Sequence, residues 1–162
     1  MKDSPFKKRL KGLTKGIEDK NIDMLWIVQP ENRRYLSGFM AHDTQLNESS
    51  GSLLITQKKA QLITDSRYTL VAEKEATDFR VITQKGVFQD EFVKQVEKAG
   101  GKSLGFEGDH VTFSLYSDLS ARIKRMKNPV KMKNISGMIE KMREIKDAHE
   151  IALMERASKM MS

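Results

Sequence analysis

The residues that most often carry catalysis are few and scattered in this chain of 162 residues. Its three histidines are His42, His110 and His149, and none stands four positions from another, the spacing that puts two metal ligands on one helix face. There is no cysteine, so thiolate zinc sites and disulfides are excluded. No serine lies in the frame of a nucleophile elbow, and no glycine-rich phosphate loop precedes a helix. The sequence therefore predicts neither a metal site built within the chain nor nucleophilic catalysis.

Two polar segments contain residue types that could bind or orient a ligand. Residues 32–39 place two arginines, a tyrosine and a glycine before a polar stretch, and residues 64–68 place Asp65, Arg67 and Tyr68 where an apolar run gives way to a helix. Binding sites in proteins with sheets and helices collect at strand ends. A helix cap at Asp65 and a surface ion pair with Arg67, contributing about 1 kcal/mol or less, also explain the second segment. From these residues alone, that structural interpretation is the better one.

The charge balance allows anionic partners without identifying one. The chain has 29 basic and 22 acidic residues, a formal net charge of +7. Basic clusters at residues 7–11 and 122–133 are typical of solvated helix faces, although such an excess also suits nucleic acid or an acidic partner domain. The clusters lack the interleaved aromatic residues on which single-stranded bases stack, so binding of nucleic acid is the weaker prediction. No apolar run approaches the roughly 18 residues of a membrane span, and no signal sequence is recognisable, so we expect a cytoplasmic protein.

The spacing of apolar residues predicts helices alternating with strands. Residues 40–50 are polar without periodicity and are expected to form an exposed loop. This alternation predicts an α/β fold with a mixed central β-sheet flanked by helices. Helices are expected at 5–17, after a cap at Asp65 or Ser66, at 88–99 and at 112–126, with a short helix or turn at 32–39; strands are expected at 24–28, 52–56, 61–64, 79–83, 103–106 and 130–132.

The last residues have the pattern of two further helices. Apolar residues recur three and four apart over 135–145, as on one face of an amphipathic helix. Asp147 and Glu150 match a capping box and begin a second helix, whose apolar stripe meets no stop signal before Ser162. We therefore expect the chain to be the front part of a longer protein.

Five motifs, in order over about residues 20–160, resemble the N-terminal domain of the creatinase, prolidase and Xaa-Pro aminopeptidase family. Each motif is weak singly, but their common order makes the resemblance specific. The motifs are Tyr35-Leu36-Ser37-Gly38-Phe39; Leu53-Leu54-Ile55-Thr56; Leu62-Ile63-Thr64-Asp65-Ser66-Arg67-Tyr68; Leu104-Gly105-Phe106-Glu107 followed by Thr112; and Arg143-Glu144-Ile145-Lys146-Asp147-Ala148-His149-Glu150-Ile151.

The resemblance implies a mixed sheet of the ribonuclease-H-like type and a role as the non-catalytic front domain of a proline-specific metallopeptidase, either an Xaa-Pro aminopeptidase or an Xaa-Pro dipeptidase. It implies that residues 1–134 form this N-terminal domain, and that 135–162 form a linker helix and the start of a catalytic domain. The fragment would hold no cofactor and be inactive alone. The catalytic domain of the parent would hold two divalent ions, manganese or cobalt. Implied partners are that domain, a second copy in a homodimer, and a peptide substrate containing proline.

The resemblance also suggests which residues approach a substrate. In some prolidases, the loop after the Gly-Phe pair reaches the active site of the neighbouring subunit. We therefore expect His42 and Asp43 to help close the entrance over the amino end of the peptide, with Arg67 and Tyr68 in the same entrance. The alternatives are a peptidase-like binding module without activity, as among relatives that bind peptides or histones, and a basic domain that binds nucleic acid.

Overall fold

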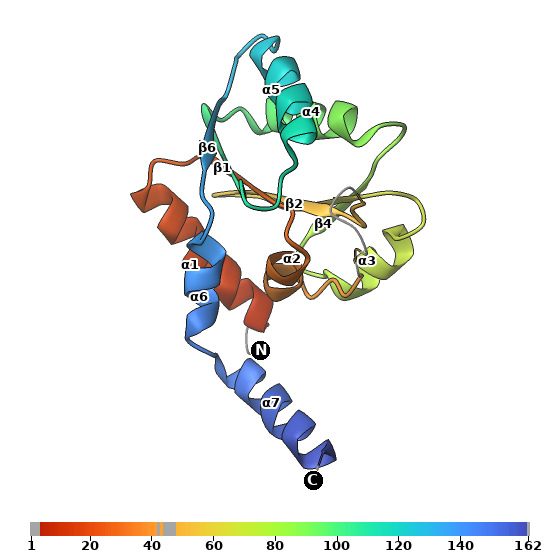
Figure 1. The fold of residues 1–162 in the computed structure, drawn as a ribbon, viewed down its shortest axis with the longest axis vertical. Coiled ribbons are helices and arrows are strands. Elements are labelled where there is room, and N and C mark those ends of the chain that lie inside the picture. The colour runs from red at the N-terminus through yellow and green to blue at the C-terminus, as the bar shows by residue number, and fades with distance from the viewer. Residues whose placement is uncertain (1–3, 42, 44–47, 162) are drawn as a thin grey trace.

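The computed structural model describes residues 4–41, 43 and 48–161, which form a mixed β-sheet with helices on both faces and one projecting helix (Figure 1). This architecture confirms the predicted α/β fold with a mixed central sheet. The strands are β1 (Met24–Ile27), β2 (Ser52–Thr56), β3 (Ala60–Thr64), β4 (Arg80–Thr83), β5 (Ser103–Phe106) and β6 (Lys131–Asn134). The helices are α1 (Pro5–Asp19), α2 (Pro30–Ser37), α3 (Thr69–Glu75), α4 (Phe88–Ala99), α5 (Phe113–Lys124), α6 (Met138–Glu144) and α7 (Ala148–Met160).

The strands lie in the order β4-β3-β2-β1-β5-β6. The chain pairs β1 with β2 and β2 with β3 antiparallel, whereas the pairs β3–β4, β1–β5 and β5–β6 are parallel. Each parallel pair needs a crossover, and α3, α4 and α5 lie in the segments that make these crossovers. The carboxyl ends of β1, β3, β4 and β5 therefore lie at the same end of the sheet, together with the amino end of β2.

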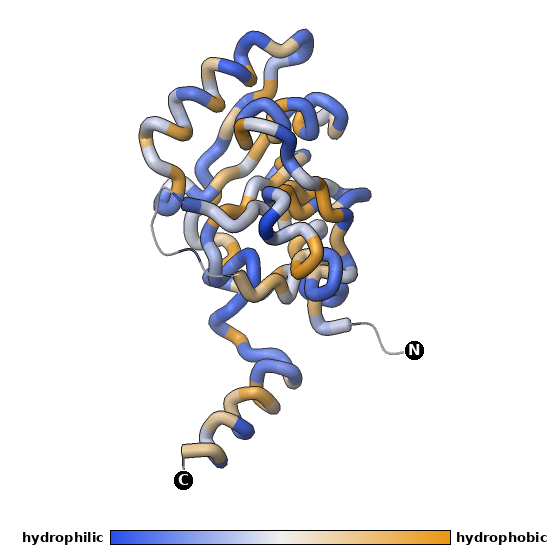
Figure 2. The backbone as a smooth tube through the Cα atoms, turned by 90° about the vertical axis from the view of Figure 1, so that its right-hand side faces the viewer, coloured by the Kyte–Doolittle hydropathy of each residue, from blue (hydrophilic) through white to orange (hydrophobic). Residues whose placement is uncertain are grey.

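Two apolar cores form because successive side chains of a strand point to opposite faces of the sheet. On β2, Leu53 and Ile55 belong to the core shared with α1, α2, α3 and α6, whereas Leu54 belongs to the core shared with α4 and α5. Trp26 is fully buried in the second core, where Phe92 lies 4.8 Å from it between ring centroids. Figure 2 shows the apolar residues gathered within the body of the molecule.

Local signals begin and end the helices. Ser4 caps α1 by accepting a hydrogen bond from Lys7 N at 3.1 Å, and Thr112 caps α5 in the same way. The αL conformation of Gly100 ends α4. The predicted cap at Asp65 or Ser66 is wrong, because α3 begins at Thr69. Asp65 instead accepts Arg67 N at 2.8 Å, a local turn that competes with helix formation.

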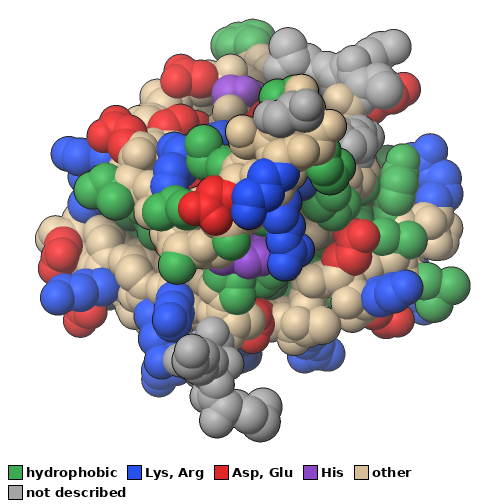
Figure 3. All heavy atoms as spheres, turned by 90° about the horizontal axis from the view of Figure 1, so that it is seen from below, with side chains coloured by type: hydrophobic (Ala, Val, Ile, Leu, Met, Phe, Trp, Pro, Cys, Tyr) green, Lys and Arg blue, Asp and Glu red, His purple; other side chains and the backbone are tan. Residues whose placement is uncertain are grey.

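The C-terminal helices differ in how they meet the body. Ile135 and Ile139 are buried in the first core, so α6 packs on that core. The predicted domain boundary after residue 134 stays a prediction. In contrast, α7 has no buried residue, although its capping box of Asp147 and Glu150 forms as predicted. Seen from the end at which α7 projects, the surface mixes hydrophobic, basic and acidic side chains (Figure 3). No helix in the described part of the chain combines the length and apolar character needed to cross a membrane.

Candidate functional site

The candidate site is a polar hollow of about 420 Å³ at the carboxyl ends of β3 and β4. Three of the four residues predicted for a substrate entrance, Asp43, Arg67 and Tyr68, line it together. The fourth, His42, lies outside the described residues. The remaining walls include Glu48, Gln84 and Phe88, so carboxylate, amide and aromatic groups all face the same space.

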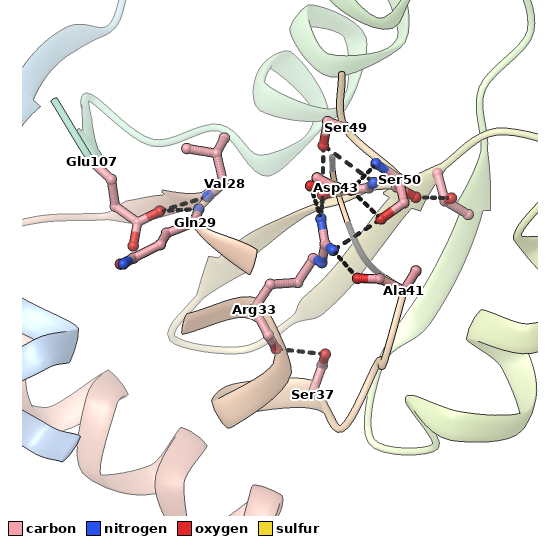
Figure 4. A network of polar contacts seen from close by, with 11 residues as sticks. Val28, Gln29, Arg33, Ser37, Ala41, Asp43, Ser49, Ser50 and Glu107 are labelled. Carbon is pink, nitrogen blue, oxygen red and sulfur yellow. Dashed lines mark hydrogen bonds and ion pairs between the residues drawn. The ribbon is translucent and has the colours of Figure 1, made fainter. Parts of the chain in front are cut away.

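The loop wall of this hollow is held by a buried arginine. Arg33 on α2 is fully buried, and its Nη1 lies 2.9 Å from Asp43 Oδ2 and donates to Gly51 O at 2.6 Å. Its Nη2 donates to Ala41 O at 2.7 Å and to Ser50 Oγ at 2.9 Å (Figure 4). One guanidinium thus joins both ends of the polar loop predicted at 40–50. Ser50 is buried as well, so this end of the loop is not exposed as expected.

Both carboxylate oxygens of Asp43 are engaged within the protein. Oδ2 faces Arg33, while Oδ1 accepts hydrogen bonds from Ser50 N at 2.7 Å and Ser50 Oγ at 2.6 Å. A charged pair removed from water stabilises a fold only when such additional bonds satisfy it. Asp43 therefore anchors the loop and has little remaining capacity to bind a ligand.

Arg67 and Tyr68 are placed differently. The side chain of Arg67 is 75% exposed, and its Nη2 lies 2.8 Å from Asp65 Oδ2. Hydrogen bonding from Arg67 lowers the pKa of Asp65, which keeps this carboxylate ionised. The Tyr68 ring packs edge-on against Phe39, with 6.4 Å between centroids. A rigid core residue thus supports the ring, while the neighbouring guanidinium remains open to solvent and to ligands.

A second buried network joins the sheet to α2 and α6. Glu107, directly after β5, accepts hydrogen bonds from Val28 N at 2.6 Å and Gln29 N at 2.8 Å, which places a carboxylate at the start of α2 (Figure 4). Asn32 Nδ2 donates to Glu107 Oε1 at 2.6 Å and to Glu140 Oε1 at 2.7 Å. Burial raises the pKa of Glu107, and the bonds from the backbone oppose this only in part. The network is structural because its groups already satisfy one another.

A third polar cluster fixes the start of α7. Arg9 on α1 is buried and donates from Nη1 to Tyr35 O at 2.7 Å. Its Nε donates to Asp147 Oδ2 at 2.8 Å, and its Nη2 lies 3.5 Å from Glu150 Oε2. Its guanidinium carbon also lies 4.1 Å from the centroid of the Tyr35 ring, a cation–π contact. One arginine therefore links α1, α2 and the capping box of α7.

Sequence reasoning missed the roles of Arg33, Asn32 and Glu107. Arg33 was one of two arginines in a noted segment, and Glu107 was part of a noted motif, but nothing in either pattern marks a buried side chain. Their partners lie up to 111 residues away, as for Asn32 and Arg143. Within residues 4–41, 43 and 48–161, no group of three or more His, Asp or Glu side chains could hold a metal ion. The hollow can therefore hold a ligand by polar and aromatic contacts, and the described residues offer no dinuclear metal centre.

Comparison with known proteins identifies the fold and its family. Residues 9–145 match the family described as the creatinase/prolidase N-terminal domain. The chain is 33% identical over 139 residues to the uncharacterized peptidase YqhT of Bacillus subtilis. The match covers 86% of this chain and 36% of that protein. It is similar to a solved Xaa-Pro dipeptidase from Bacillus anthracis, with a TM-score of 0.78, 31% identity, and coverage of 91% of this chain and 38% of that one.

A third comparison concerns a domain solved by itself. The N-terminal domain of the cytoplasmic peptidase PepQ from Mycobacterium tuberculosis has a TM-score of 0.70 and 28% identity, with 83% of this chain and 97% of that chain covered. The matched family region begins within α1 and ends just after α6, so it contains the whole sheet, both cores and the hollow. The chain therefore belongs to the family of creatinase/prolidase N-terminal domains.

Proposed function

We propose that this chain is the non-catalytic N-terminal domain of an Xaa-Pro metallopeptidase, in which it forms part of the substrate entrance and contributes to dimerisation. The family match supports this proposal, as do relatives whose names state Xaa-Pro dipeptidase or aminopeptidase activity. The chain spans 36% of the Bacillus subtilis relative and 38% of the Bacillus anthracis structure, so such proteins contain much more than this domain.

The observation that carries the proposed entrance is the convergence of Asp43, Arg67 and Tyr68 on one hollow. The loop residue and the two β3–α3 residues are more than twenty positions apart in sequence, and the fold brings them to one space. An exposed guanidinium beside a supported aromatic ring can receive a peptide carbonyl or carboxylate and pack against its side chain. Arg67 and Tyr68 are therefore the residues that we expect to touch the peptide.

The engaged carboxylate of Asp43 refines its proposed role. Because Arg33 and Ser50 occupy both of its oxygens, Asp43 is a positioning residue that sets the path of the loop. Its neighbour His42 remains the residue of this loop that we propose to close over the amino end of the peptide. A variant at Asp43 would thus report on the loop as a whole, whereas variants at Arg67 and Tyr68 report on direct contacts.

The metal chemistry of such an enzyme belongs outside this chain. The described residues provide no cluster that fits a pair of divalent ions, so no catalytic step is assigned to them. We propose that a following catalytic domain holds two ions, manganese or cobalt, and that the chain alone is inactive. The other proposed partners are a second copy in a homodimer and a peptide containing proline. The cytoplasm is the proposed location, in keeping with the similarity to a cytoplasmic peptidase of Mycobacterium tuberculosis.

Kinetics of the full-length enzyme test the entrance. We expect R67Q and Y68L, the second of which removes the aromatic ring but keeps an apolar side chain, to raise KM for an Xaa-Pro peptide about three- to tenfold with little change in kcat, because lost binding that is equal in ground and transition states affects KM alone. The matched control is R80Q, which removes an exposed arginine at the start of β4, away from this hollow. Values of KM that are equal in R67Q, Y68L and the unaltered enzyme would refute the entrance role.

A second measurement tests the family role itself. The isolated chain should not hydrolyse Xaa-Pro peptides with manganese, cobalt or any other divalent ion added. Turnover by the isolated chain that survives repurification would contradict the proposed division of labour. A downstream domain in which the metal ligands are replaced would instead favour the peptidase-like binding module. In that case, R67Q and Y68L should still weaken peptide binding when it is measured directly.

A further inference from the structure

Three lysines from three separate parts of the chain line a second hollow, of about 670 Å³. None of its lining residues belongs to the proposed entrance. Lys20 directly follows α1, Lys133 lies on β6 and Lys141 lies on α6. Figure 1 shows α6 lying beside α1 with β6 leading into it, so the hollow forms where these elements meet. Neither the family match nor the proposed function assigns a role to it.

The charged side chains that line this hollow are all basic. Its lining contains the three lysines and no aspartate or glutamate. Lys133 Nζ donates to the neutral carbonyl of Asn21 at 3.1 Å, and no ion pair joins Lys20 or Lys141 to a carboxylate within the described residues. Like charges in a concave surface with low-dielectric walls reinforce one another and raise the local concentration of anions.

The floor of the hollow is apolar and firmly held. Ile22 and Ile135 are buried there, and Met138 and Met142 complete the lining. On α1, a Cβ added at Gly16 would lie 3.4 Å from Met138 Cε, an ordinary van der Waals distance, so α6 packs directly on this face of α1. The walls consequently belong to packed helices and a paired strand, which preserves the spacing of the lysines.

We propose that this hollow binds a small organic phosphate, a molecule with a phosphoryl or pyrophosphoryl group on an apolar body. Lysine binds phosphate as a point charge, and the volume is in the range of small-molecule sites. The apolar floor suits the rest of such a ligand. Single-stranded nucleic acid fits less well, because the lining contains no aromatic side chain on which bases could stack.

A purely structural role explains only part of this arrangement. Lys133 satisfies a carbonyl just beyond α1, and Lys20 stands at the end of that helix, where a positive charge is favourable. Lys141 lies in the last turn of α6, where a positive charge is likewise favourable. These roles explain where each lysine stands, but they do not explain why all three line one hollow. A ligand with two or more negative charges accounts for all three lysines.

The test is a titration of the isotope-labelled chain, followed by amide shifts in two-dimensional NMR. The ligands are inorganic phosphate, inorganic pyrophosphate and ADP, each added at constant ionic strength so that general screening does not change. We expect saturable shifts confined to residues 20–22 and 133–142, with ADP and pyrophosphate binding more tightly than phosphate. The variant K20Q/K133Q/K141Q should bind at least about tenfold more weakly, because it removes the charge-assisted contacts.

Matched variants separate a site from general basicity. The control K85Q/K124Q/K127Q removes the same charge from exposed positions elsewhere and should leave the affinity within about twofold. The double variant K20Q/K141Q leaves the bond from Lys133 to Asn21 intact and should retain the fold while still losing affinity. Vesicles containing phosphatidic acid form a further arm, and their retention of the chain only when the three lysines are present would identify a lipid source of the phosphate.

Three results would overturn the proposal. The first is the absence of saturable shifts up to about 10 mM pyrophosphate or ADP, a concentration at which even weak binding is measurable. The second is an equal loss of affinity in the control and the hollow variants. The third is binding of duplex DNA through these lysines without any binding of the small phosphates, which would make the surface a nucleic-acid contact.

Discussion

Replacing Arg9 with methionine should release α7 from the body of the protein. The substitution keeps an unbranched apolar stem of similar reach but removes the guanidinium that contacts Asp147, Glu150 and the Tyr35 carbonyl. No residue of α7 is buried, and the ring of His149 meets Phe6 only edge-on at 6.3 Å between centroids, so apolar packing contributes little to holding this helix in its place. Its direction depends on the polar cluster at its first turn.

The expected loss of stability follows from the contacts. The hydrogen bond to the buried Tyr35 carbonyl contributes about 1 kcal/mol, and the charge-assisted pair with Asp147, whose side chain is 36% exposed, contributes about another 1 kcal/mol after allowance for solvent. A total of about 2 kcal/mol in a chain of this length lowers Tm by roughly 4–8 °C. The capping box itself remains, so α7 should keep its helical structure.

The assay uses the absence of cysteine in this chain. Two cysteines introduced at the exposed positions Glu97 on α4 and Lys159 on α7 can carry spin labels, and pulsed electron resonance then measures the distribution of distances between them. We expect one narrow distribution for the unaltered residue at position 9 and a markedly broader one for R9M. The control R156M removes an exposed arginine from α7 itself and should leave the distribution narrow. An R9M distribution as narrow as that of the control would refute the reasoning.

Three further predictions concern the remaining polar and close contacts, and each uses urea unfolding followed by the fluorescence of the single tryptophan. D43A and D43N each leave the buried Arg33 charge without its counter-ion and should lower the free energy of unfolding by about 3–5 kcal/mol, with D43N at the lower end because it keeps an acceptor; a D43N variant as stable as the unaltered chain would contradict the ion pair. The raised pKa of Glu107 means that the folded state binds this proton more tightly, so stability falls as pH rises from the usual glutamate value through the raised one; E107Q should remove this slope, and an unchanged slope would assign it to other groups. G105A would place a Cβ 2.8 Å from Leu25 Cδ2 and should cost about 1–3 kcal/mol, so a neutral effect would show that the core can yield there.

The order of helices and strands was predictable because it depends on short-range patterns. Apolar spacing, the glycine after α4 and the capping box of α7 each act within a few residues, and each prediction from them is confirmed. The failure at Asp65 is local in origin as well. An aspartate before a helical pattern resembles a cap, but here its carboxylate accepts Arg67 N and forms a turn, and α3 begins only at Thr69.

The candidate site was predictable only in its exposed part. Arg67 and Tyr68 follow a strand directly, and strand ends are a general location for sites, so the rule and the family motif agreed on them. The burial of Arg33 depends on a guanidinium meeting Asp43 and the carbonyls of Ala41 and Gly51, and no periodicity encodes that meeting. Arginines are mostly exposed, and a sequence pattern gives no reason to expect one with no exposed surface.

The hollow combines two kinds of polar residue whose roles depend on each other. The side chains of Arg33 and Asp43 are buried and paired with each other, so they fix where the loop leaves the body and where it returns at Ser50. Arg67 is exposed and pairs with its neighbour Asp65 at the surface, so a ligand can compete for it at a cost of about 1 kcal/mol or less. A buried pair could not release its charge to a substrate so cheaply, and an exposed pair could not hold a loop in one position. The separation of these tasks therefore predicts that D43N and R67Q affect different measurements, the first the stability and the second the affinity for peptide.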